Sequence, residues 1–511
     1  MEILHQSFEV RRTEALHKLE QKGIRILSSQ EISSMSSHFQ QEMRAGIESN
    51  SIDPQGIKMY RSHIMPRPEG QLLPMGSTVL IAEVGGTNAY AALAHADEQG
   101  NVKIMTTDDG QKLLIKSPLR ERSANGKREY TGPDDFFGEL INKMDGLLKN
   151  VPQIDAIGVV YSFPGNAVQT AHGIDVISSE ALPKDFDIPG ISKNTVLIDG
   201  VETVQDRLIG ESLVYALCQK YPDILIDPYI PIMVGNDTVA VALSKAGSKL
   251  GGVIGTGFNS AVATNVDGQM QYLNTEAGAS VSVPETEIFR QLGGSNEKRN
   301  ENPAERQISG ISLGNYLDKS AEYLIKEGIL PRRADVNDGD SKMPKTLGPE
   351  SVTAAIDNDK YALSEAFVRL LTDKEFAVLK DVAQIIADRS AQIAGTMIGT
   401  MVNTFTSAFS EDSLFIPIEG SIFWKIPQYR EKVAVFAHAI APNKTFVFGE
   451  AAPEQAGIMG MGAAALGRLS IRISASIMNQ QEDRIHDAHA DITSIYMFRD
   501  FSRRQHRAPF D

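Results

Sequence analysis

Apolar residues recur in two different rhythms along this chain. Between Ser7 and Ser49 they fall near helical spacing among charged residues. Residues 78–107 and 250–273 instead contain short apolar runs separated by glycine and polar turns, which is typical of strands. Each of these two regions has the order strand, glycine turn, strand, turn, strand. The shared layout predicts two sheets in separate halves of the chain, related by an internal duplication.

Further elements are expected between and after these regions. The predicted strands are 155–163, 231–235, 414–420 and 444–450, and the predicted helices are 201–220, 312–328, 373–409 and 457–469. The weakly charged stretch 393–409 is interrupted by Gly, Thr, Asn and Ser, so a buried helix explains it better than a membrane span of about 20 apolar residues. The pattern therefore predicts a large α/β protein with sheets in two lobes.

Composition narrows the classes of function. The 511 residues include 50 Lys and Arg against 65 Asp and Glu, a net charge of −15. A chain of this length exceeds what one core usually serves, and an acidic surface disfavours nucleic-acid binding. The single Cys218 excludes a disulfide framework, and the N-terminus has no apolar run typical of a signal peptide. We expect a cytoplasmic protein without a nucleic-acid or membrane partner.

Two glycine turns are candidate phosphate-binding sites. EVGGTN (83–88) and IGTGFN (254–259) both follow apolar strands, and their glycines let backbone N–H groups approach a phosphate closely. The alternative interpretation of each turn is an ordinary hairpin. Neither is a Walker loop or a dinucleotide fingerprint. Two such turns in two lobes could close on opposite sides of one polyphosphate.

A carboxylate between these turns is the candidate for chemistry. Asp237 lies beside Asn236 at the end of a predicted buried strand, where it could accept a hydroxyl proton. The alternative is that Asp237 and Thr238 only cap a helix. Ser162 and Glu276 could bind a polar ligand, although a turn serine and a salt-bridged glutamate are commoner. Glu305 by itself resembles a surface helix residue.

Taken in order, these segments resemble the hexokinase family of actin-like sugar kinases. LIAEVGGTN (80–88) resembles the family's first phosphate motif, VGNDTVA (234–240) the segment with its catalytic aspartate, and IGTGFNSA (254–261) its second phosphate motif. Three further segments resemble the family's sugar-binding segments: GVVYSFPG (158–165), NTEAGA (274–279) and ERQISGISLG (305–314). IPIEGSIF (416–423) resembles the family's turn on the adenosine side. The resemblance covers about residues 30–470.

The resemblance implies an α/β architecture: a two-lobed actin-like ATPase (ribonuclease H-like) fold of the hexokinase type, with a cleft between the lobes. It implies an N-terminal helical segment at 1–76 packed on the large lobe, a small lobe at 77–233 and a large lobe at 234–470. Residues 471–511 form a C-terminal extension in this scheme.

The resemblance also implies a reaction and its residues. The γ-phosphoryl group of MgATP would pass to the 6-hydroxyl of glucose or a related hexose, the first step of glycolysis, in a monomer or homodimer. Asp237 is implied as the base, and ATP and Mg²⁺ are the implied cofactors, with no side chain assigned as a direct metal ligand. The implied sugar ligands are Ser162, Lys184, Asn236, Asn259, Glu276 and Glu305. The implied nucleotide ligands are Gly85, Gly86, Thr87, Asn88, Gly255, Thr256, Gly257, Gly420 and Ser421.

The sequence departs from the family pattern mainly on the nucleotide side. Glu83 and Glu419 replace aspartates, Tyr90 replaces an arginine, and Ala277 replaces a tryptophan. A tyrosine cannot supply the fixed charge of an arginine. An alternative function is therefore a catalytically weak, hexokinase-like sugar-binding regulator. An actin-like chaperone or filament ATPase would fit the two phosphate turns but not the sugar-binding segments.

Overall fold

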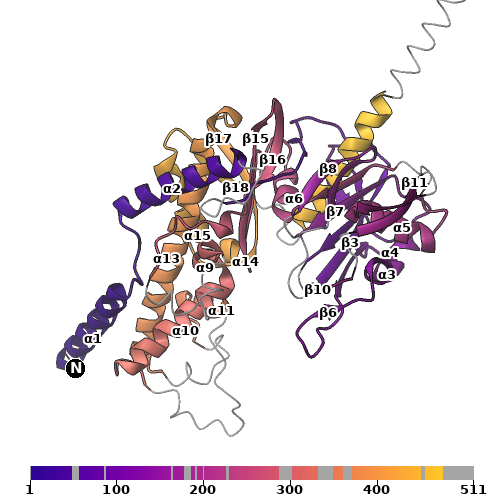
Figure 1. The fold of residues 1–511 in the computed structure, drawn as a ribbon. Coiled ribbons are helices and arrows are strands. Elements are labelled where there is room, and N and C mark those ends of the chain that lie inside the picture. The colour runs from indigo at the N-terminus through magenta and orange to yellow at the C-terminus, as the bar shows by residue number, and fades with distance from the viewer. Residues whose placement is uncertain are drawn as a thin grey trace, which may run out of the picture.

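The protein has two lobes, each built around one large sheet (Figure 1). The computed structural model describes residues 2–48, 57–85, 88–162, 165–177, 186–189, 193–198, 201–225, 230–286, 302–331, 349–360, 371–449 and 455–475.

The sheet of the small lobe has the strand order β4-β3-β2-β7-β13-β9-β8. Strand β4 pairs with the end of β3, and β5 pairs with its first half, from Asn88 to Ala92. Its strands are β2 (Thr78–Val84), β3 (Asn88–Ala96), β4 (Val102–Ile104), β5 (Leu114–Pro118), β7 (Ala156–Tyr161), β8 (Asn166–Gln169), β9 (Gly173–Ile177) and β13 (Ile232–Gly235). Strands β2, β3 and β4 form an antiparallel meander, and β2, β7 and β13 run parallel. The predicted hairpin and the strands after it are confirmed.

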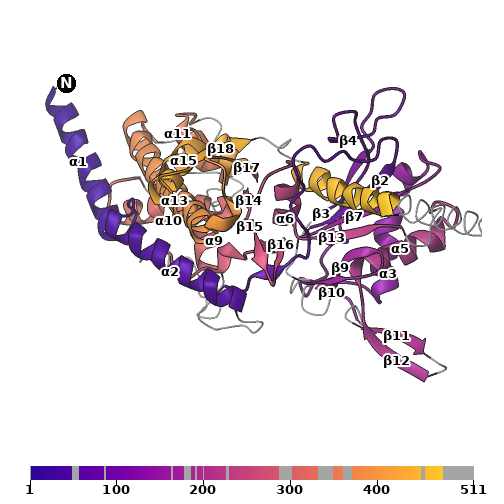
Figure 2. The same ribbon diagram turned by 90° about the horizontal axis from the view of Figure 1, so that it is seen from above.

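Helices cover both faces of this sheet. Alternate residues of β2 point to opposite faces, so Leu80 packs with Phe136 and Leu213 whereas Ile81 packs with Met461. The first face is covered by α3 (Pro133–Lys143), α4 (Asp145–Leu148) and α5 (Ile209–Lys220), and the second by the helix at 456–475. The small pair β6 (Arg128–Glu129) and β10 (Phe186–Asp187) lies beside the lobe, and the hairpin of β11 (Lys193–Ile198) and β12 (Val201–Asp206) projects from it (Figure 2).

The sheet of the large lobe has the order β1-β16-β15-β14-β17-β18. Its strands are β1 (Tyr60–Arg61), β14 (Leu250–Ile254), β15 (Phe258–Val266), β16 (Gln269–Asn274), β17 (Ser413–Glu419) and β18 (Thr445–Gly449). Strands β14, β15 and β16 form an antiparallel meander, and β17 pairs with β14 in parallel. The two meanders that the repeated sequence pattern predicted are confirmed, and in both sheets the first strand of the meander also pairs with a parallel neighbour.

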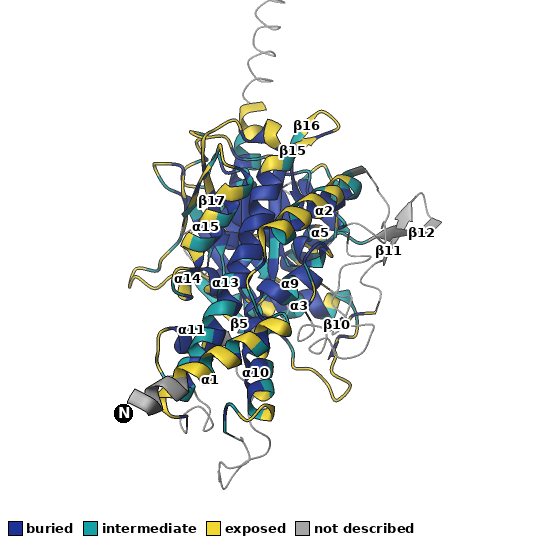
Figure 3. Cartoon of the chain, turned by 90° about the vertical axis from the view of Figure 1, so that its left-hand side faces the viewer, coloured by how far each residue is buried: buried dark blue, intermediate teal, exposed yellow. Residues whose placement is uncertain are grey.

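The helices of the large lobe pack around one long buried helix, α13 (Asp373–Thr404) (Figure 3). Gly395 and Gly399 let α15 (Tyr429–Ile440) approach it, because a Cβ on either would lie 2.5 Å from a carbonyl oxygen of Val433 or Ala437. The predicted buried helix in this region is confirmed. None of the helices within the described ranges is both long and apolar enough to cross a bilayer. The other helices here are α1 (Glu2–Gln21), α2 (Ser29–Glu48), α9 (Pro303–Ile308), α10 (Gly310–Lys326), α11 (Pro349–Ile356), α14 (Ser421–Lys425) and α15 (Tyr429–Ile440), with short 3-10 turns at Ala277–Ala279 and Thr406–Ala408.

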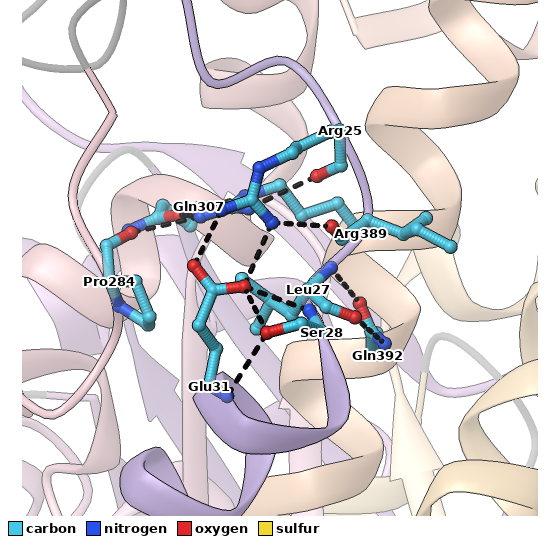
Figure 4. A network of polar contacts seen from close by, with 9 residues as sticks. Arg25, Leu27, Ser28, Glu31, Pro284, Gln307, Arg389 and Gln392 are labelled. Carbon is cyan, nitrogen blue, oxygen red and sulfur yellow. Dashed lines mark hydrogen bonds and ion pairs between the residues drawn. The ribbon is translucent and has the colours of Figure 1, made fainter. Parts of the chain in front are cut away.

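A buried arginine of α13 joins three separate segments (Figure 4). The guanidinium of Arg389 donates to the carbonyl oxygen of Arg25 (3.1 Å), to that of Pro284 (2.9 Å) and to Oε1 of Gln307 on α9 (3.0 Å). Burial lowers its pKa to about 10, so it remains charged at neutral pH. Neighbouring contacts are Leu27 with Gln392 and the ion pair of Arg25 with Glu31, which fix the turn between α1 and α2. The N-terminal helices are thereby attached to the same helix that supports α9.

One predicted helix is partly wrong. Residues 201–220 were expected to be helical, but Val201–Asp206 forms strand β12, and α5 begins only at Ile209. The segment VETVQD carries two valines and a threonine, which are β-branched and favour strands. It pairs with β11 over six residues in antiparallel register, from Lys193 with Asp206 to Ile198 with Val201. Pairing with a neighbouring segment therefore overrides the helical spacing.

The two lobes meet at helix α6 (Asp237–Leu243) and the helix at 456–475. Helix α6 follows β13 of the small-lobe sheet and packs against β14 of the large-lobe sheet, where a Cβ on Gly251 would lie 2.6 Å from Ala242. Gly460 lies against α6 from the other side, and a Cβ there would lie only 1.7 Å from the carbonyl oxygen of Ala240. The contact between these helices thus requires glycine at position 460.

Gly460→Ala should destabilise the protein. The added methyl group would collide with backbone, so we expect the free energy of unfolding to fall by about 2 kcal/mol or more. Gly467→Ala is the matched control in the same helix, because its nearest atoms belong to the flexible side chain of Gln71 at 3.7 Å. It should leave stability unchanged or raise it by up to about 1 kcal/mol. Thermal unfolding followed by circular dichroism measures both, and equal midpoints for the two variants would contradict the prediction.

Candidate active site

A cavity of about 710 Å³ lies between the two lobes, where the ends of β7 and β13 meet β14 and β15. The cavity brings together most of the residues that the sequence singled out. Those that line it are Ser162, Asn236, Asp237, Gly255, Thr256, Gly257, Asn259, Glu276, Glu305, Gly420 and Ser421. They come from segments up to 259 positions apart, so only the fold places them around one space.

Asp237 is held at the N-terminus of α6. The helix cap expected from Asp237 and Thr238 is instead Asn236, whose Oδ1 accepts from the backbone N–H of Thr238 at 3.0 Å and from its hydroxyl at 2.6 Å. Oδ1 of Asp237 also accepts from this N–H, at 2.7 Å, and Asp237 lines the cavity. Burial and the charge of Glu305 raise the pKa of Asp237 to about 6, opposed by hydrogen bonds from the Thr238 amide and the Ser162 hydroxyl.

Glu276 is oriented by two asparagines. Its Oε1 accepts from Nδ2 of Asn274 at 2.7 Å and from Nδ2 of Asn259 at 3.4 Å. Asn259 also donates to Oδ1 of Asn274 at 2.8 Å and accepts from the Ala277 N–H at 3.2 Å. Burial and the charges of Asp237 and Glu305 raise the pKa of Glu276 to about 7 in spite of these bonds. The network engages one carboxylate oxygen of Glu276 and leaves the other for a ligand.

The backbone of Glu276 is in the left-handed region, with φ 46° and ψ 38°. Non-glycine residues rarely adopt this conformation, which costs about 1 kcal/mol or more and tends to occur at functional sites. The following turn, Ala277–Ala279, is held by the bond from Ala277 to Asn259. Its packing against the large-lobe core therefore sustains a strained backbone that directs a carboxylate into the cavity.

Glu305 lies in the first turn of α9 and contacts the second glycine turn. Its Oε2 accepts from the backbone N–H of Phe258 at 3.1 Å, and Nδ2 of Asn302 lies 3.4 Å from its Oε1. A Cβ on Gly257 would come within 2.9 Å of Oε2. The residue that looked like a surface glutamate thus belongs to the cavity, and Gly257 is the residue that lets it approach.

The second glycine turn and the Gly420–Ser421 turn lie against each other. A Cβ on Gly255 would lie 3.1 Å from the Cα of Gly420. Gly420 has φ 122°, and a Cβ there would lie 2.2 Å from the carbonyl oxygen of Ile254, so only glycine fits. Helix α14 begins at Ser421, immediately after this contact. The two turns form one glycine-lined wall of the cavity.

The first glycine turn lies at the end of the β2–β3 hairpin, where the Gly85 N–H donates to the carbonyl oxygen of Asn88 at 3.1 Å. Gly85 and Asn88 are not among the described residues that line the cavity, although Glu83, two positions earlier, is. Gly86, Thr87 and Lys184, which the resemblance also implied as ligands, lie outside the described residues.

Glu83 and Glu419 bring carboxylates to the cavity from opposite lobes. Burial and the charges of Glu419 and Asp237 raise the pKa of Glu83 to about 8, opposed by Lys116. Oε2 of Glu419 accepts from the Gly457 N–H at 3.3 Å, at the start of the helix 456–475. Among the described residues, no three His, Cys, Asp or Glu side chains are grouped closely enough to hold a metal ion by themselves. The oxygen donors of Glu83 and Glu419 fit Mg²⁺ that keeps several waters and arrives bound to phosphates.

Two further asparagines belong to the cavity region. Asn274 lies in the NTEAGA segment (274–279), which the sequence analysis quoted without naming Asn274 as a ligand, and Asn302 was not singled out. Asn274 is 3% exposed and orients both Glu276 and Asn259. Asn302 lines the cavity at the N-terminus of α9, beside Glu305. Their spacing of two and three positions from a glutamate was the available signal. Neither spacing alone distinguishes a ligand from a solvent-exposed amide.

Comparisons with known proteins agree with this arrangement. Two family models described as hexokinase match residues 18–246 and 249–467. Hexokinase-2 of Equus caballus is 22% identical over 458 residues, covering 82% of this chain and 44% of that protein. The hexokinase of Schistosoma mansoni is 21% identical over 432 residues, covering 79% of this chain and 87% of that protein. The chain thus spans less than half the length of the hexokinase-2 relative.

Solved structures confirm the fold. The structure of Schistosoma mansoni hexokinase complexed with glucose superimposes with a TM-score of 0.66 at 18% identity, covering 90% of this chain and 99% of that one. A second hexokinase crystal structure gives 0.68 at 16% identity, covering 91% and 100%. The predicted two-lobed actin-like ATPase fold is correct. Since the two family models together span nearly all of residues 18–467, the chain belongs to the hexokinase family of sugar kinases.

Proposed function

We propose that this protein is an ATP-dependent hexokinase, which transfers the γ-phosphoryl group of MgATP to the 6-hydroxyl of glucose or a related hexose, the first step of glycolysis. The observation that carries the proposal is the position of Asp237. Its carboxylate lines a cavity that also contains side chains able to bind hydroxyl groups, Ser162, Asn259, Glu276 and Glu305, and the glycine-lined wall. A base between a sugar site and a phosphate site is what phosphoryl transfer to an alcohol requires.

Asp237 would accept the proton of the attacking hydroxyl. With a pKa of about 6, the carboxylate is ionised at neutral pH yet more basic than an ordinary aspartate. The sugar oxygen would attack the γ-phosphorus while Asp237 takes its proton, and the bond from phosphorus to the β-phosphate oxygen would break. Most of the remaining catalysis comes from positioning and charge stabilisation.

A hexose would be recognised by carboxylates and amides, because it offers a ring of hydroxyls and little apolar surface. Glu276 and Glu305 supply charge-assisted acceptors, and Ser162 and Asn236 supply further polar groups. Asn259 donates to Asn274 and Glu276, so it would reach the sugar by exchanging one of these bonds. Lys184 remains a predicted ligand. The related Schistosoma mansoni enzyme was solved with glucose, which supports this choice of substrate.

The nucleotide would lie against the glycine-lined wall. The backbone N–H groups of Gly255, Thr256 and Gly257 and the turn at Gly420–Ser421 would hold the phosphates, together with the first glycine turn. Mg²⁺ would arrive with ATP as part of the substrate. Burial and the charges of Glu419 and Asp237 raise the pKa of Glu83 to about 8, and a cation bound beside Glu83 would favour its ionised form.

Asp237→Asn should abolish most turnover while sparing sugar binding. Loss of the base is expected to lower kcat by roughly 10²–10⁴-fold, with the dissociation constant for glucose changed by less than about 3-fold. A coupled assay of glucose-dependent ADP release measures turnover, and calorimetry measures binding. Asp223→Asn, at an exposed turn of the small lobe, is the control and should behave as the unmodified protein. Near-normal turnover of Asp237→Asn would refute the assignment of the base.

The same assay separates the two candidate functions. If the unmodified protein binds glucose but releases no nucleoside diphosphate from any nucleoside triphosphate of a panel, the sugar-binding regulator is correct and the hexokinase proposal is wrong. The altered residues Glu83, Tyr90 and Glu419 are the specific observation that favours this second candidate.

The rate should fall on acidification in two steps. Activity requires ionised Glu276 and Asp237, whose pKa values of about 7 and about 6 lie above those of ordinary carboxyls. Activity is therefore present above about pH 7 and lost as the pH falls through both values. The logarithm of kcat/KM for glucose should acquire a slope of one between these values and approach two below them. Glu276→Gln should bind glucose more weakly and show a single slope. A profile that stays flat to pH 5 would contradict this prediction.

Asn274→Ala should weaken sugar binding through Glu276. Removal of its amide deletes the hydrogen bond that favours the ionised carboxylate, so the pKa of Glu276 rises further. We expect the dissociation constant for glucose at pH 7 to rise about 10-fold and its pH midpoint to move upward. Calorimetry between pH 6 and 8.5 tests this. Asn265→Ala, an exposed asparagine of the same sheet, is the control, and identical binding by the two variants would contradict the role of Asn274.

A further inference from the structure

The cavity between the lobes is strongly acidic. Five Asp and Glu side chains line it, although Glu83, with a pKa of about 8, is largely protonated at neutral pH. None of the described lining residues is Lys or Arg. The five are Glu83, Asp237, Glu276, Glu305 and Glu419. The whole chain, including these five residues, has a formal net charge of −15. A nucleoside triphosphate that approaches this cavity meets an unfavourable field, so a nearby cationic side chain would matter more here than in a neutral cleft.

We propose that Lys116 is the cation that contacts the nucleotide phosphates from the small lobe, with the ring of Tyr90 as its support. The proposal rests on the proposed function, because it assigns the nucleotide side of the same site. It concerns a strand that neither the phosphate motifs nor the sugar-binding segments include.

Strand pairing places Lys116 in one row of paired residues with Tyr90 and Glu83, and Glu83 lines the cavity. Glu83 of β2 pairs with Tyr90 of β3, and Tyr90 pairs with Lys116 of β5. Directly paired residues point to the same face of a sheet, so all three lie on the face from which Glu83 enters the cavity. Strands are about 4.8 Å apart, so the Cα atoms of Lys116 and Glu83 are about 10 Å apart. A lysine side chain can span much of that distance.

The same pairing brings β5 to the first glycine turn. Pro118, two residues after Lys116, pairs with Asn88 at the end of that turn. Two residues of a strand cover about 7 Å. Lys116 therefore lies near Asn88, the described residue at the end of this turn.

The ammonium group of Lys116 lies over the side chain of Tyr90, its paired residue on β3. Nζ of Lys116 lies 5.1 Å from the centre of the Tyr90 ring, a cation–π contact. Tyr90 is partly buried against the small-lobe core, so its ring is a fixed platform. The charge of Lys116 also lowers the pKa of Glu83, against the larger raising effect of burial and Glu419. The lysine thus already acts on a carboxylate of the cavity, across the intervening strand.

Lysine suits this position because its ammonium is a compact, mobile point charge. The Lys116 side chain is exposed, so it can turn toward a phosphate when a nucleotide binds. Tyr90 and Lys116 together supply an aromatic support and a positive charge. Lys116 on the adjacent strand thus supplies the positive charge that tyrosine lacks at position 90.

The test compares Lys116→Met with Lys112→Met, an exposed lysine of the same segment. Calorimetry with Mg²⁺ and the non-hydrolysable ATP analogue AMPPNP, at saturating glucose and about 0.1 M salt, measures binding without turnover. We expect Lys116→Met to weaken nucleotide binding about 10-fold and to leave glucose binding unchanged. Lys112→Met should change neither. Nucleotide binding by Lys116→Met equal to that by Lys112→Met would overturn the proposal.

Charge rescue distinguishes a phosphate contact from a structural effect. Adding Tyr90→Arg to Lys116→Met should recover most of the lost nucleotide affinity, and a double variant as weak as the single one would overturn the proposal. Nucleotide binding is measured separately from turnover. An unmodified protein that binds the nucleotide but releases no ADP therefore contradicts only the proposed function. The comparison of Lys116→Met with Lys112→Met still decides the present inference. An unmodified protein that binds no nucleotide overturns both.

Discussion

Partial burial of carboxylates at the junction of two sheets is the constraint on which the rest of the site depends. Three carboxyl groups enter one cavity: Asp237 from α6, Glu276 from the turn after β16, and Glu83 from strand β2. Burial raises the pKa of each. Like charges this close are tolerated only where amides, hydroxyls or cations offset them. The polar contacts of the site offset the free-energy cost of burying these carboxylates close together.

Each carboxylate is offset in a different way. Asp237 receives hydrogen bonds from a backbone amide and from Ser162. Glu276 is supported by Asn274 and Asn259. Glu83 has the distant charge of Lys116 and the most strongly raised pKa of the three. The carboxylates proposed to bind the sugar are therefore held by hydrogen bonds within the protein, whereas Glu83, on the proposed nucleotide side, lies where a bound cation would offset charge.

Close backbone approaches hold these groups in place. Gly460 lets the helix 456–475 contact α6, and Gly257 lets Glu305 reach the second glycine turn. On the far side of the large lobe, Arg389 joins α13 to α9 and to the N-terminal helices. The position of Glu305 thus depends on packing that extends from the cavity to the first helices of the chain.

The sequence by itself determined the local elements and singled out most of the residues that line the cavity. The hairpin at 78–96, the meander at 250–273 and the helix at 373–404 follow from the spacing of apolar residues, which neighbours in the chain decide. The strand at 201–206 was missed because it depends on pairing with β11. The tertiary structure alone decided that Asn236 rather than Asp237 caps α6, that Asn274 orients Glu276, and that Lys116 lies in one row with Glu83. These relations depend on side-chain direction and strand register. Such contacts form between segments that the chain brings together only when it folds.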